Sequence, residues 1–201
     1  MSSRVLVLFA HPALHKSRVH RRLVAVAERT DGVTLHDLYE AYPDFDIDVP
    51  REQELLLAHD VIVLQHPFYW YSTPAILKQW EDLVLEHGWA YGSRGTMLQG
   101  KRVMSAITVG GREAAYGAEG HNRRTVQEFL YPIEQTVRLC RMDYLPPFLV
   151  LGTHLMTAPD IERAAAAYGR VLAGLRDGTL DLEAARRLGR VEAGLGATTA
   201  A

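Results

Sequence analysis

The chain has 201 residues, of which 48% are hydrophobic and 23% charged, and its formal net charge is −2. This composition is typical of a globular domain rather than a disordered chain, and the small net charge gives no general attraction to nucleic acid. No segment approaches the roughly 20 apolar residues of a membrane-spanning helix. The single cysteine, Cys140, excludes an intrachain disulfide and a cysteine-based zinc site. The first strand begins too close to Met1 for a signal peptide, so we expect a cytoplasmic protein.

The first apolar run, Val5 to Ala10, is rich in strand-forming residues and is typical of a strand buried on both faces of a parallel sheet. The dipeptide His11-Pro12 ends this strand, because proline has no N–H for the ladder. Ser17 then predicts the N-cap of a helix. A buried strand, a short polar loop and a capped helix together predict a phosphate site made by Ser17, backbone N–H groups and a basic side chain. The alternative is a solvated basic helix face that the serine only caps.

Two groups of residues in the first third of the chain contain possible metal ligands, but we predict no metal site at either group. His11, His15 and His20 have no carboxylate beside them. The acidic loop from Tyr39 to Pro50 lacks the glycine and the distal glutamate that a calcium-binding loop needs at fixed offsets.

Strands and helices alternate along the rest of the chain. The expected strands are Val33–Leu38, Asp60–Gln65, Arg102–Val109 and Tyr144–Leu151; the expected helices are Arg51–His59, Ala75–Leu85, Thr125–Cys140 with a break near Pro132, Pro159–Leu175 and, in the tail, Leu182–Leu195. Pro146 and Pro147 place the last strand at a sheet edge or defer it to Phe148. This alternation predicts an α/β three-layer sandwich with a five-stranded parallel sheet in the flavodoxin-like order 2-1-3-4-5. We expect one domain over residues 1–178 and a C-terminal extension over residues 179–201, partly helical and disordered at its end.

The loops after the first, third and fourth strands should meet in one crevice at the carboxyl edge of the sheet. Pro67 to Trp70 and the following Tyr71 place four aromatic side chains just past a buried strand, which predicts a wall for a flat conjugated ring. The alternative, for about half of them, is packing under the next helix or at a subunit interface. Thr108 to Gly111 ends in two glycines, which allow close backbone approach to a ligand or simply form a turn. Tyr116 and His121 lie downstream, within reach of the same pocket.

The three loops describe one elongated pocket, with a phosphate at one end, an aromatic ring in the middle and polar donors at the other end. FMN, or the flavin half of FAD, matches this description. The sequence has no G-x-G-x-x-G after a strand, no Walker A motif, no G-x-S-x-G elbow and no H-E-x-x-H. The classical dinucleotide-binding fold and the hydrolase fold are therefore disfavoured.

Several motifs together resemble the flavodoxin-2 family of NAD(P)H:quinone oxidoreductases, and most of all the ancillary flavoproteins of glutathione-gated potassium-efflux systems. They are Ala10-His11-Pro12 with Ser17, His66–Ser72, Leu85–Gly92 and Thr108–Gly111, supported by Tyr42–Asp48 and Leu145–Phe148. The resemblance extends over about residues 4–175 and does not cover the tail.

The resemblance implies flavin contacts from three loops and two catalytic side chains. The implied cofactor-binding residues are His11, Ser17, Arg18, Val19, His20, Pro67, Phe68, Tyr69, Trp70, Thr108, Val109, Gly110 and Gly111. The family usually has asparagine where this chain has His20, and frequently threonine where it has Val109. Tyr116 matches by spacing a tyrosine that polarises the reduced flavin, and His121 is offset by about one residue from a histidine with the same role.

The main hypothesis is a ping-pong quinone reductase, in which NAD(P)H reduces bound FMN (or FAD) and a quinone or similar electrophile then reoxidises it. The alternative is a regulatory ancillary subunit of a potassium-efflux transporter, placed at the inner face of the membrane by its protein partner, with the redox activity secondary. A one-electron carrier of flavodoxin type ranks last, because such carriers are usually strongly acidic and this chain has a net charge of only −2. The family resemblance and the exposed aromatic residues near the crevice also indicate a homodimer.

Overall fold

One parallel sheet of five strands organises the part of the chain that this computed structural model describes, residues 2–196. The strands are β1 (Val5–Phe9), β2 (Val33–Asp37), β3 (Val61–Pro67), β4 (Arg102–Val109) and β5 (Asp143–Leu151), and they lie in the order β2-β1-β3-β4-β5. Every residue of β1 and β3 is buried, as expected for the central strands of a sheet covered on both faces. The predicted fold class and strand order are confirmed.

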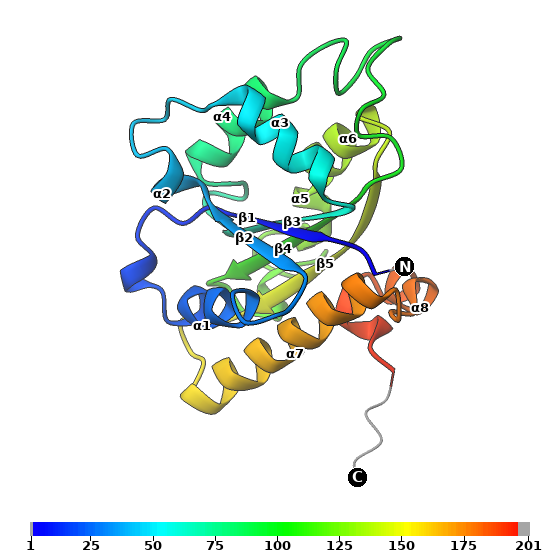
Figure 1. Ribbon diagram of the computed structural model, residues 1–201. Helices are drawn as coiled ribbons and strands as arrows, with labels where there is room; N and C mark the ends of the chain where they lie inside the picture. The colour runs from blue at the N-terminus through cyan, green and yellow to red at the C-terminus, as the bar shows by residue number, and fades with distance from the viewer. Residues whose placement is uncertain (1, 197–201) are drawn as a thin grey trace.

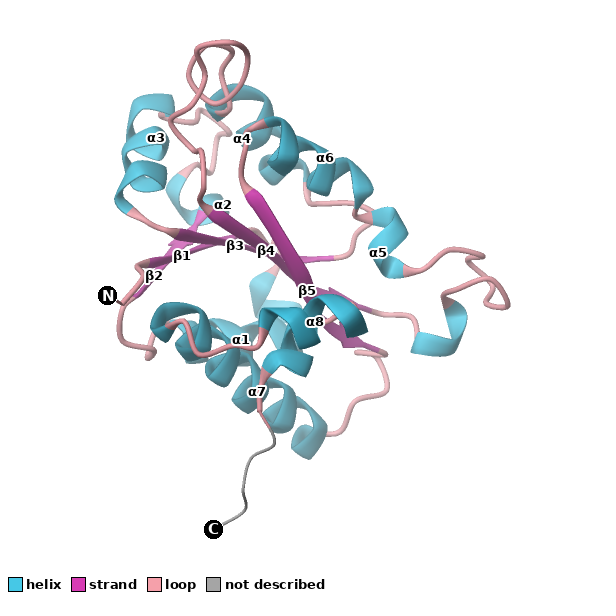
Figure 2. Ribbon diagram, turned by 90° about the vertical axis from the view of Figure 1, so that its right-hand side faces the viewer, coloured by secondary structure: helices cyan, strands magenta, loops and turns pink. Residues whose placement is uncertain are grey.

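Helices cover both faces of the sheet, so the molecule has three layers (Figures 1 and 2). The upper layer in Figure 1 contains α2 (Leu38–Ala41), α3 (Val49–Ala58), α4 (Ala75–Val84), α5 (Val126–Phe129) and α6 (Tyr131–Leu139). The lower layer contains α1 (Arg18–Ala27), α7 (Ala158–Asp177) and α8 (Leu182–Leu188). Three short 3-10 helices, η1 (Leu14–Lys16), η2 (Glu113–Ala115) and η3 (Val191–Gly194), lie between or after these elements. Each layer buries its own apolar cluster against the sheet.

The region from Tyr39 to Pro50, predicted as a loop, contains a short helix and the start of a longer one. Asp37 caps α2, since its Oδ1 accepts from the backbone N–H of Tyr39 at 3.0 Å. Asp48 caps α3 in the same way, and Pro50 lies in the first turn, where its missing N–H costs nothing. The helix predicted from Arg51 therefore begins two residues earlier, because the acidic residues act as caps.

Prolines shape two other elements as their positions predict. Pro132 lies in the first turn of α6 and separates it from α5, which confirms the expected break. β5 includes Pro146 and Pro147 and lies at the sheet edge, where one side of a strand needs no ladder hydrogen bonds. The register between β4 and β5 shifts between Met104 and Ala106, which accommodates the proline pair.

The buried carboxylate of Glu52 links α3 by hydrogen bonds to β2, to α4 and to the residue that follows α2. Glu52 on α3 is fully buried, and its oxygens accept hydrogen bonds from His36 Nε2 at 2.7 Å, Tyr42 Oη at 2.5 Å and Trp80 Nε1 at 2.8 Å. These donors compensate the cost of removing the charge from water, and hydrogen bonding to them keeps the pKa of Glu52 below its usual value although burial acts in the opposite direction.

The C-terminal extension packs on the lower layer. Gly189, in the left-handed conformation at φ 69°, ends α8, so the predicted helix Leu182–Leu195 is divided into α8 and η3. Val191 is fully buried, Arg186 pairs with Asp143 on β5 at 2.8 Å, and Arg190 pairs with Glu113 on the loop that follows β4. The predicted disorder concerns residues 197–201, which lie outside the described residues.

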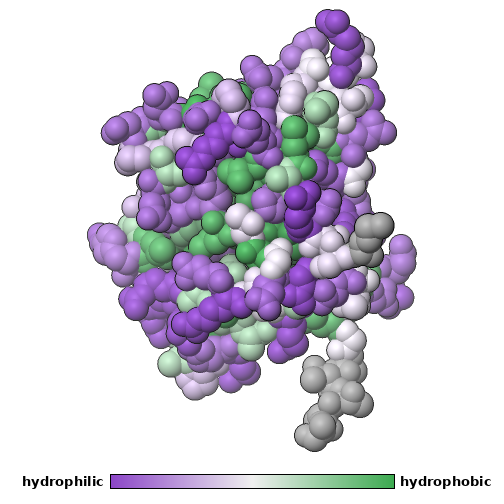
Figure 3. Space-filling model, in the orientation of Figure 1, coloured by the Kyte–Doolittle hydropathy of each residue, from purple (hydrophilic) through white to green (hydrophobic). Residues whose placement is uncertain are grey.

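The surface shown in Figure 3 is mostly hydrophilic, and hydrophobic residues reach it mainly in the band between the two helical layers. Among the described helices, none combines the length and the hydrophobicity that a bilayer crossing requires.

Candidate functional site

A cleft of about 590 Å³ opens at the carboxyl ends of β1, β3 and β4. Its size lies in the range of small-molecule sites, and its place is the switch point of a doubly wound sheet, where β1 is followed in space by β2 on one side and β3 on the other. The cleft is lined by His11, Ala13, Lys16, Ser17, Arg18, Val19, Pro67, Phe68, Tyr69, Trp70, Tyr71, Thr108, Val109, Gly110, Gly111, Tyr116, Thr153 and His154. The three predicted loops therefore meet in one place.

The N-terminus of α1 forms one end of the cleft. Ser17 Oγ accepts from the backbone N–H of His20 at 3.1 Å, which confirms the predicted N-cap. The backbone N–H groups of Arg18 and Val19 have no acceptor among residues 2–196. Unpaired N–H groups and the helix dipole favour an anion at this position, and the basic residue Lys16 also lines the cleft.

His11 lies between this end and the aromatic loop. Its Nδ1 accepts from the backbone N–H of Ala13 at 3.0 Å, so the neutral ring carries its proton on Nε2. Burial lowers the pKa of His11 below 6.5, and the charge of nearby His15 adds to this effect. The ring is therefore neutral at pH 7 and is a donor through Nε2.

In the aromatic loop after β3, Phe68 is half-buried and Tyr69, Trp70 and Tyr71 are exposed. Phe68 packs against Tyr71, Tyr116 and Phe129 with ring centroids 5.9–6.3 Å apart. Trp70 is 93% exposed, and its φ of 50° is unusual for a residue with a side chain. Tyr71 follows with a φ of 64°. Such backbone conformations persist only where the surrounding structure enforces them, and they gather at binding sites.

The glycine pair after β4 leaves backbone donors open to the cleft. Neither Gly110 nor Gly111 has an acceptor for its backbone N–H within the described residues. A Cβ at Gly110 would lie 2.5 Å from His154 Nε2, and one at Gly111 would lie 3.1 Å from Tyr116 Cε2. Glycine therefore lets these side chains approach the backbone. Burial raises the pKa of Tyr116, so its phenol stays protonated and can donate.

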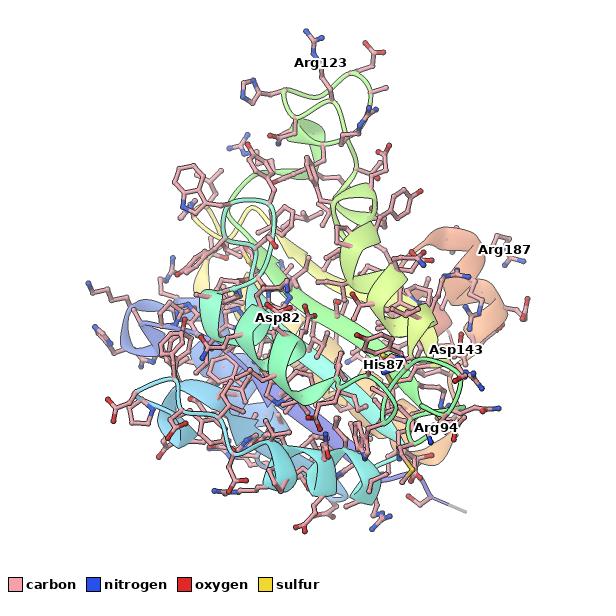
Figure 4. The ribbon with its side chains drawn as sticks, turned by 90° about the horizontal axis from the view of Figure 1, so that it is seen from above. Asp82, His87, Arg94, Arg123, Asp143 and Arg187 are labelled. Atoms are coloured by element: carbon pink, nitrogen blue, oxygen red, sulfur yellow. The ribbon has the colours of Figure 1, made fainter. Side chains whose placement is uncertain are left out.

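Two predicted site residues do not line the cleft. The side chain of His20 is fully buried beneath it and lies 2.9 Å from Thr108 Oγ1 through Nε2. His121 is exposed on the loop between Gly117 and Thr125, which projects from the molecule with Arg123 at its tip (Figure 4). All the other predicted site residues line the cleft.

Five lining residues were not predicted as site residues. They are Ala13, Lys16, Tyr71, Thr153 and His154. Thr153 and His154 follow the carboxyl end of β5, so the rule that placed the other loops also applies to them. They are not part of an aromatic run or a glycine pair, the two patterns that singled out the other loops.

A three-layer α/β fold with a parallel sheet in the order β2-β1-β3-β4-β5 and a cleft at the strand switch point defines the flavodoxin-like class of folds. Within that class, the chain belongs to the family described as flavodoxin-like fold (Flavodoxin_2), which its sequence matches over residues 3–172.

Individual relatives cover most of the chain. It is 45% identical over 172 residues to the glutathione-regulated potassium-efflux system ancillary protein KefG of Enterobacter sp. (strain 638), covering 86% of this chain and 94% of that protein. General stress protein 14 of Treponema denticola, solved in complex with FMN, is similar with a TM-score of 0.82 and 40% identity, covering 86% and 99% of the two chains. An NADPH-quinone reductase from P. pentosaceus is similar with a TM-score of 0.76 and 33% identity, covering 83% and 96%.

Proposed function

We propose that the chain binds FMN in the cleft and is an NAD(P)H oxidoreductase that reduces quinones or similar electrophiles. The observation that carries this proposal is the order of groups along the cleft: a helix N-terminus with unpaired N–H groups, an aromatic wall, and a glycine pair with open backbone donors. A similar solved structure holds FMN, and another is an NADPH-quinone reductase.

The phosphate of the cofactor would lie at the N-terminus of α1. Because Ser17 Oγ already accepts from the N–H of His20, its own proton is free to donate to a phosphate oxygen. The N–H groups of Arg18 and Val19 add two donors, and Lys16 adds positive charge.

The ring of the cofactor would lie between Pro67–Trp70 and the glycine pair. Bound flavin would supply the hydride chemistry, accepting two electrons from NAD(P)H and passing them to a quinone in a second half-reaction. The N–H groups of Gly110 and Gly111, which have no acceptor among the described residues, would be available as fixed donors to negative charge on the ring, and such donors stabilise charge without reorganisation. Tyr116, neutral and beside Gly111, would add a hydroxyl donor.

The test begins with the visible spectrum of the purified protein and the identity of the cofactor released on denaturation, which also separates FMN from FAD. Stopped-flow reduction of the flavin-loaded protein by NADH and by NADPH then measures the first half-reaction. We expect Tyr116→Phe to slow this reduction more than it weakens flavin binding, with Tyr131→Phe, an exposed tyrosine on α6, as the control. A colourless protein that rebinds no flavin contradicts the proposal.

The similarity to KefG favours a second role, as an ancillary protein of a potassium-efflux system at the inner face of the membrane. Co-purification with such a transporter, and its activation by a flavin-free variant, would support a regulatory role that does not need the redox reaction. No association after mild detergent extraction would contradict it.

We also propose a homodimer in which the exposed aromatic residues beside the cleft, Tyr69, Trp70 and Tyr71, are covered by a second copy. Sedimentation equilibrium of the wild type and of Trp70→Ala tests this, with Leu188→Ala, a second exposed apolar residue far from the loop in sequence, as the control. A monomeric wild type at micromolar concentration contradicts it.

A further inference from the structure

A chain of buried hydrogen bonds runs from α7 through β3 and α1 to the wall of the cleft. Tyr168 Oη donates to Gln65 Oε1 at 2.8 Å, Gln65 Nε2 lies 3.4 Å from His20 Nδ1, and His20 Nε2 lies 2.9 Å from Thr108 Oγ1. Tyr168, Gln65 and His20 are fully buried, whereas Thr108 borders the cleft. The chain therefore joins the core of the lower layer to the functional site.

The direction of these hydrogen bonds is fixed at the tyrosine. Within residues 2–196 the Tyr168 hydroxyl has Gln65 as its hydrogen-bond partner and no other. A buried hydroxyl that lost its acceptor would cost the desolvation of its proton, so Gln65 presents its carbonyl oxygen to Tyr168 and its amide nitrogen to His20. An amide nitrogen only donates, so His20 Nδ1 is the acceptor and the ring carries its proton on Nε2. That proton is donated to Thr108 Oγ1.

The charge state of His20 agrees with this direction. An imidazolium would set Nδ1–H against the Gln65 amide N–H, donor against donor. Burial lowers the pKa of His20 well below 6.5, and repulsion by His11 or His66, where either is protonated, lowers it further, which outweighs the opposite influence of the His66 backbone. The ring is therefore neutral at the pH of the cell.

We propose that Tyr168, Gln65 and His20 are positioning residues that hold the Thr108 hydroxyl as a hydrogen-bond donor to the cofactor in the cleft. Thr108 Oγ1 accepts from His20, and its own proton has no acceptor among the described residues. The proton is thus available to a ligand atom that gains negative charge. This inference rests on the proposed flavin site. It adds the Thr108 hydroxyl as a hydrogen-bond donor, whose direction is fixed by buried residues outside the cleft.

The two-electron reduction potential of the bound flavin tests the donor. A donor that strengthens as the flavin gains charge favours the reduced form, so Thr108→Val should weaken the affinity for reduced relative to oxidised flavin about tenfold, equivalent to a potential about 30 mV lower. Thr108→Ser keeps a hydroxyl and should keep the wild-type potential. An unchanged potential in Thr108→Val overturns the proposal.

The role of the buried residues is tested by a double-mutant cycle. Tyr168→Phe releases the Gln65 amide and should lower the potential in the same direction, by part of the Thr108→Val shift. In the Thr108→Val background the same change should have no further effect, because its route to the cofactor is gone. The matched control is Tyr144→Phe, which removes a hydroxyl bonded to Ser105 on β4 at 2.8 Å without touching this chain. Additive shifts, or an equal shift in the control, overturn the positioning role.

A measurement on flavin-free protein separates this inference from the proposed function. Nitrogen-15 NMR reports which imidazole nitrogen is protonated, and the His20 signal, identified by its loss in His20→Gln, should show the Nε2–H form in wild type and a mixture in Tyr168→Phe. An Nδ1–H form in wild type overturns the inference even if flavin binds. A wild type that binds no flavin removes the proposed function, and the tautomer still decides the direction of the buried chain.

Discussion

Acidification should destabilise the fold through His66, the last-but-one residue of β3. This side chain is fully buried, its Nδ1 lies 2.9 Å from the carbonyl oxygen of Pro67, and its Nε2 has no partner within the described residues. Burial lowers the pKa of His66 from 6.5 to about 4. At 1.36 kcal/mol for each pKa unit, this difference corresponds to about 3 kcal/mol of folding free energy.

The direction of the change in unfolding free energy depends on whether the folded or the unfolded chain binds the proton. Between pH 6.5 and about 4 the unfolded chain binds a proton at this histidine and the folded chain does not, so the free energy of unfolding falls as the pH falls. The contribution is complete above pH 6.5 and is lost near pH 4. His11 and His20, whose pKa values are also lowered, act in the same direction.

Urea unfolding followed by circular dichroism at several pH values from 7.5 to about 4 measures this loss. In His66→Gln the amide can still donate to Pro67, and the decrease in unfolding free energy should be smaller than in wild type by about 3 kcal/mol. The control is His154→Gln, the same substitution at an exposed histidine. Equal slopes for wild type and His66→Gln would refute the reasoning.

Three further changes test other parts of the structure. Glu52→Gln should lower the free energy of unfolding by about 3 kcal/mol, because an amide cannot accept from all three donors, whereas exposed Glu54→Gln should stay within about 0.5 kcal/mol in the same urea assay. Ser17→Ala should cost about 1 kcal/mol as a lost N-cap and weaken FMN binding measured by fluorescence quenching; exposed Ser93→Ala should do neither. Burial raises the pKa of Cys140 to about 11, so iodoacetamide at pH 8 should label it slowly in the native protein and rapidly in urea, as mass spectrometry would show.

Each of these three expectations has an outcome that contradicts it. A Glu52→Gln protein as stable as wild type would mean that the donors find other acceptors. FMN affinity unchanged in Ser17→Ala would place the phosphate elsewhere. Equal labelling rates of Cys140 in native and unfolded protein would show that the thiol is accessible.

Much of the fold could be predicted because its signals are local. The buried strands are unbroken apolar runs such as Val5–Ala10, and proline or a capping residue marks most ends. The short helix α2 escaped prediction because four residues carry no periodicity, and only the capping carboxylate of Asp37 indicates it. The division of the tail helix depends on Gly189, which ends α8. A glycine is also tolerated inside a helix at a modest cost in stability, so the sequence alone does not show that the helix ends there.

The site was predictable to the extent that topology alone brings loops together. Parallel strands place their carboxyl ends at one edge, so the loops at Ser17, Pro67 and Gly110 had to meet. Sequence does not show how a helix is rotated, and the rotation of α1 turns His20 into the core. The bond between His20 and Thr108 joins residues 88 positions apart, and no local pattern predicts such a pair.

The C-terminal extension, residues 179–201, lies beyond the family match, which ends at residue 172, and its described part contacts the loop that carries Tyr116. Arg190 holds Glu113 on one side of that loop, and the Gly189 carbonyl accepts from Gln127 at 3.1 Å on the other. A loop that is held only at its two ends has many accessible conformations. Each additional contact along the loop shortens the unrestrained length and lowers the number of these conformations. These two contacts therefore restrict, from outside the cleft, the conformations open to the segment between Glu113 and Gln127, which contains Tyr116.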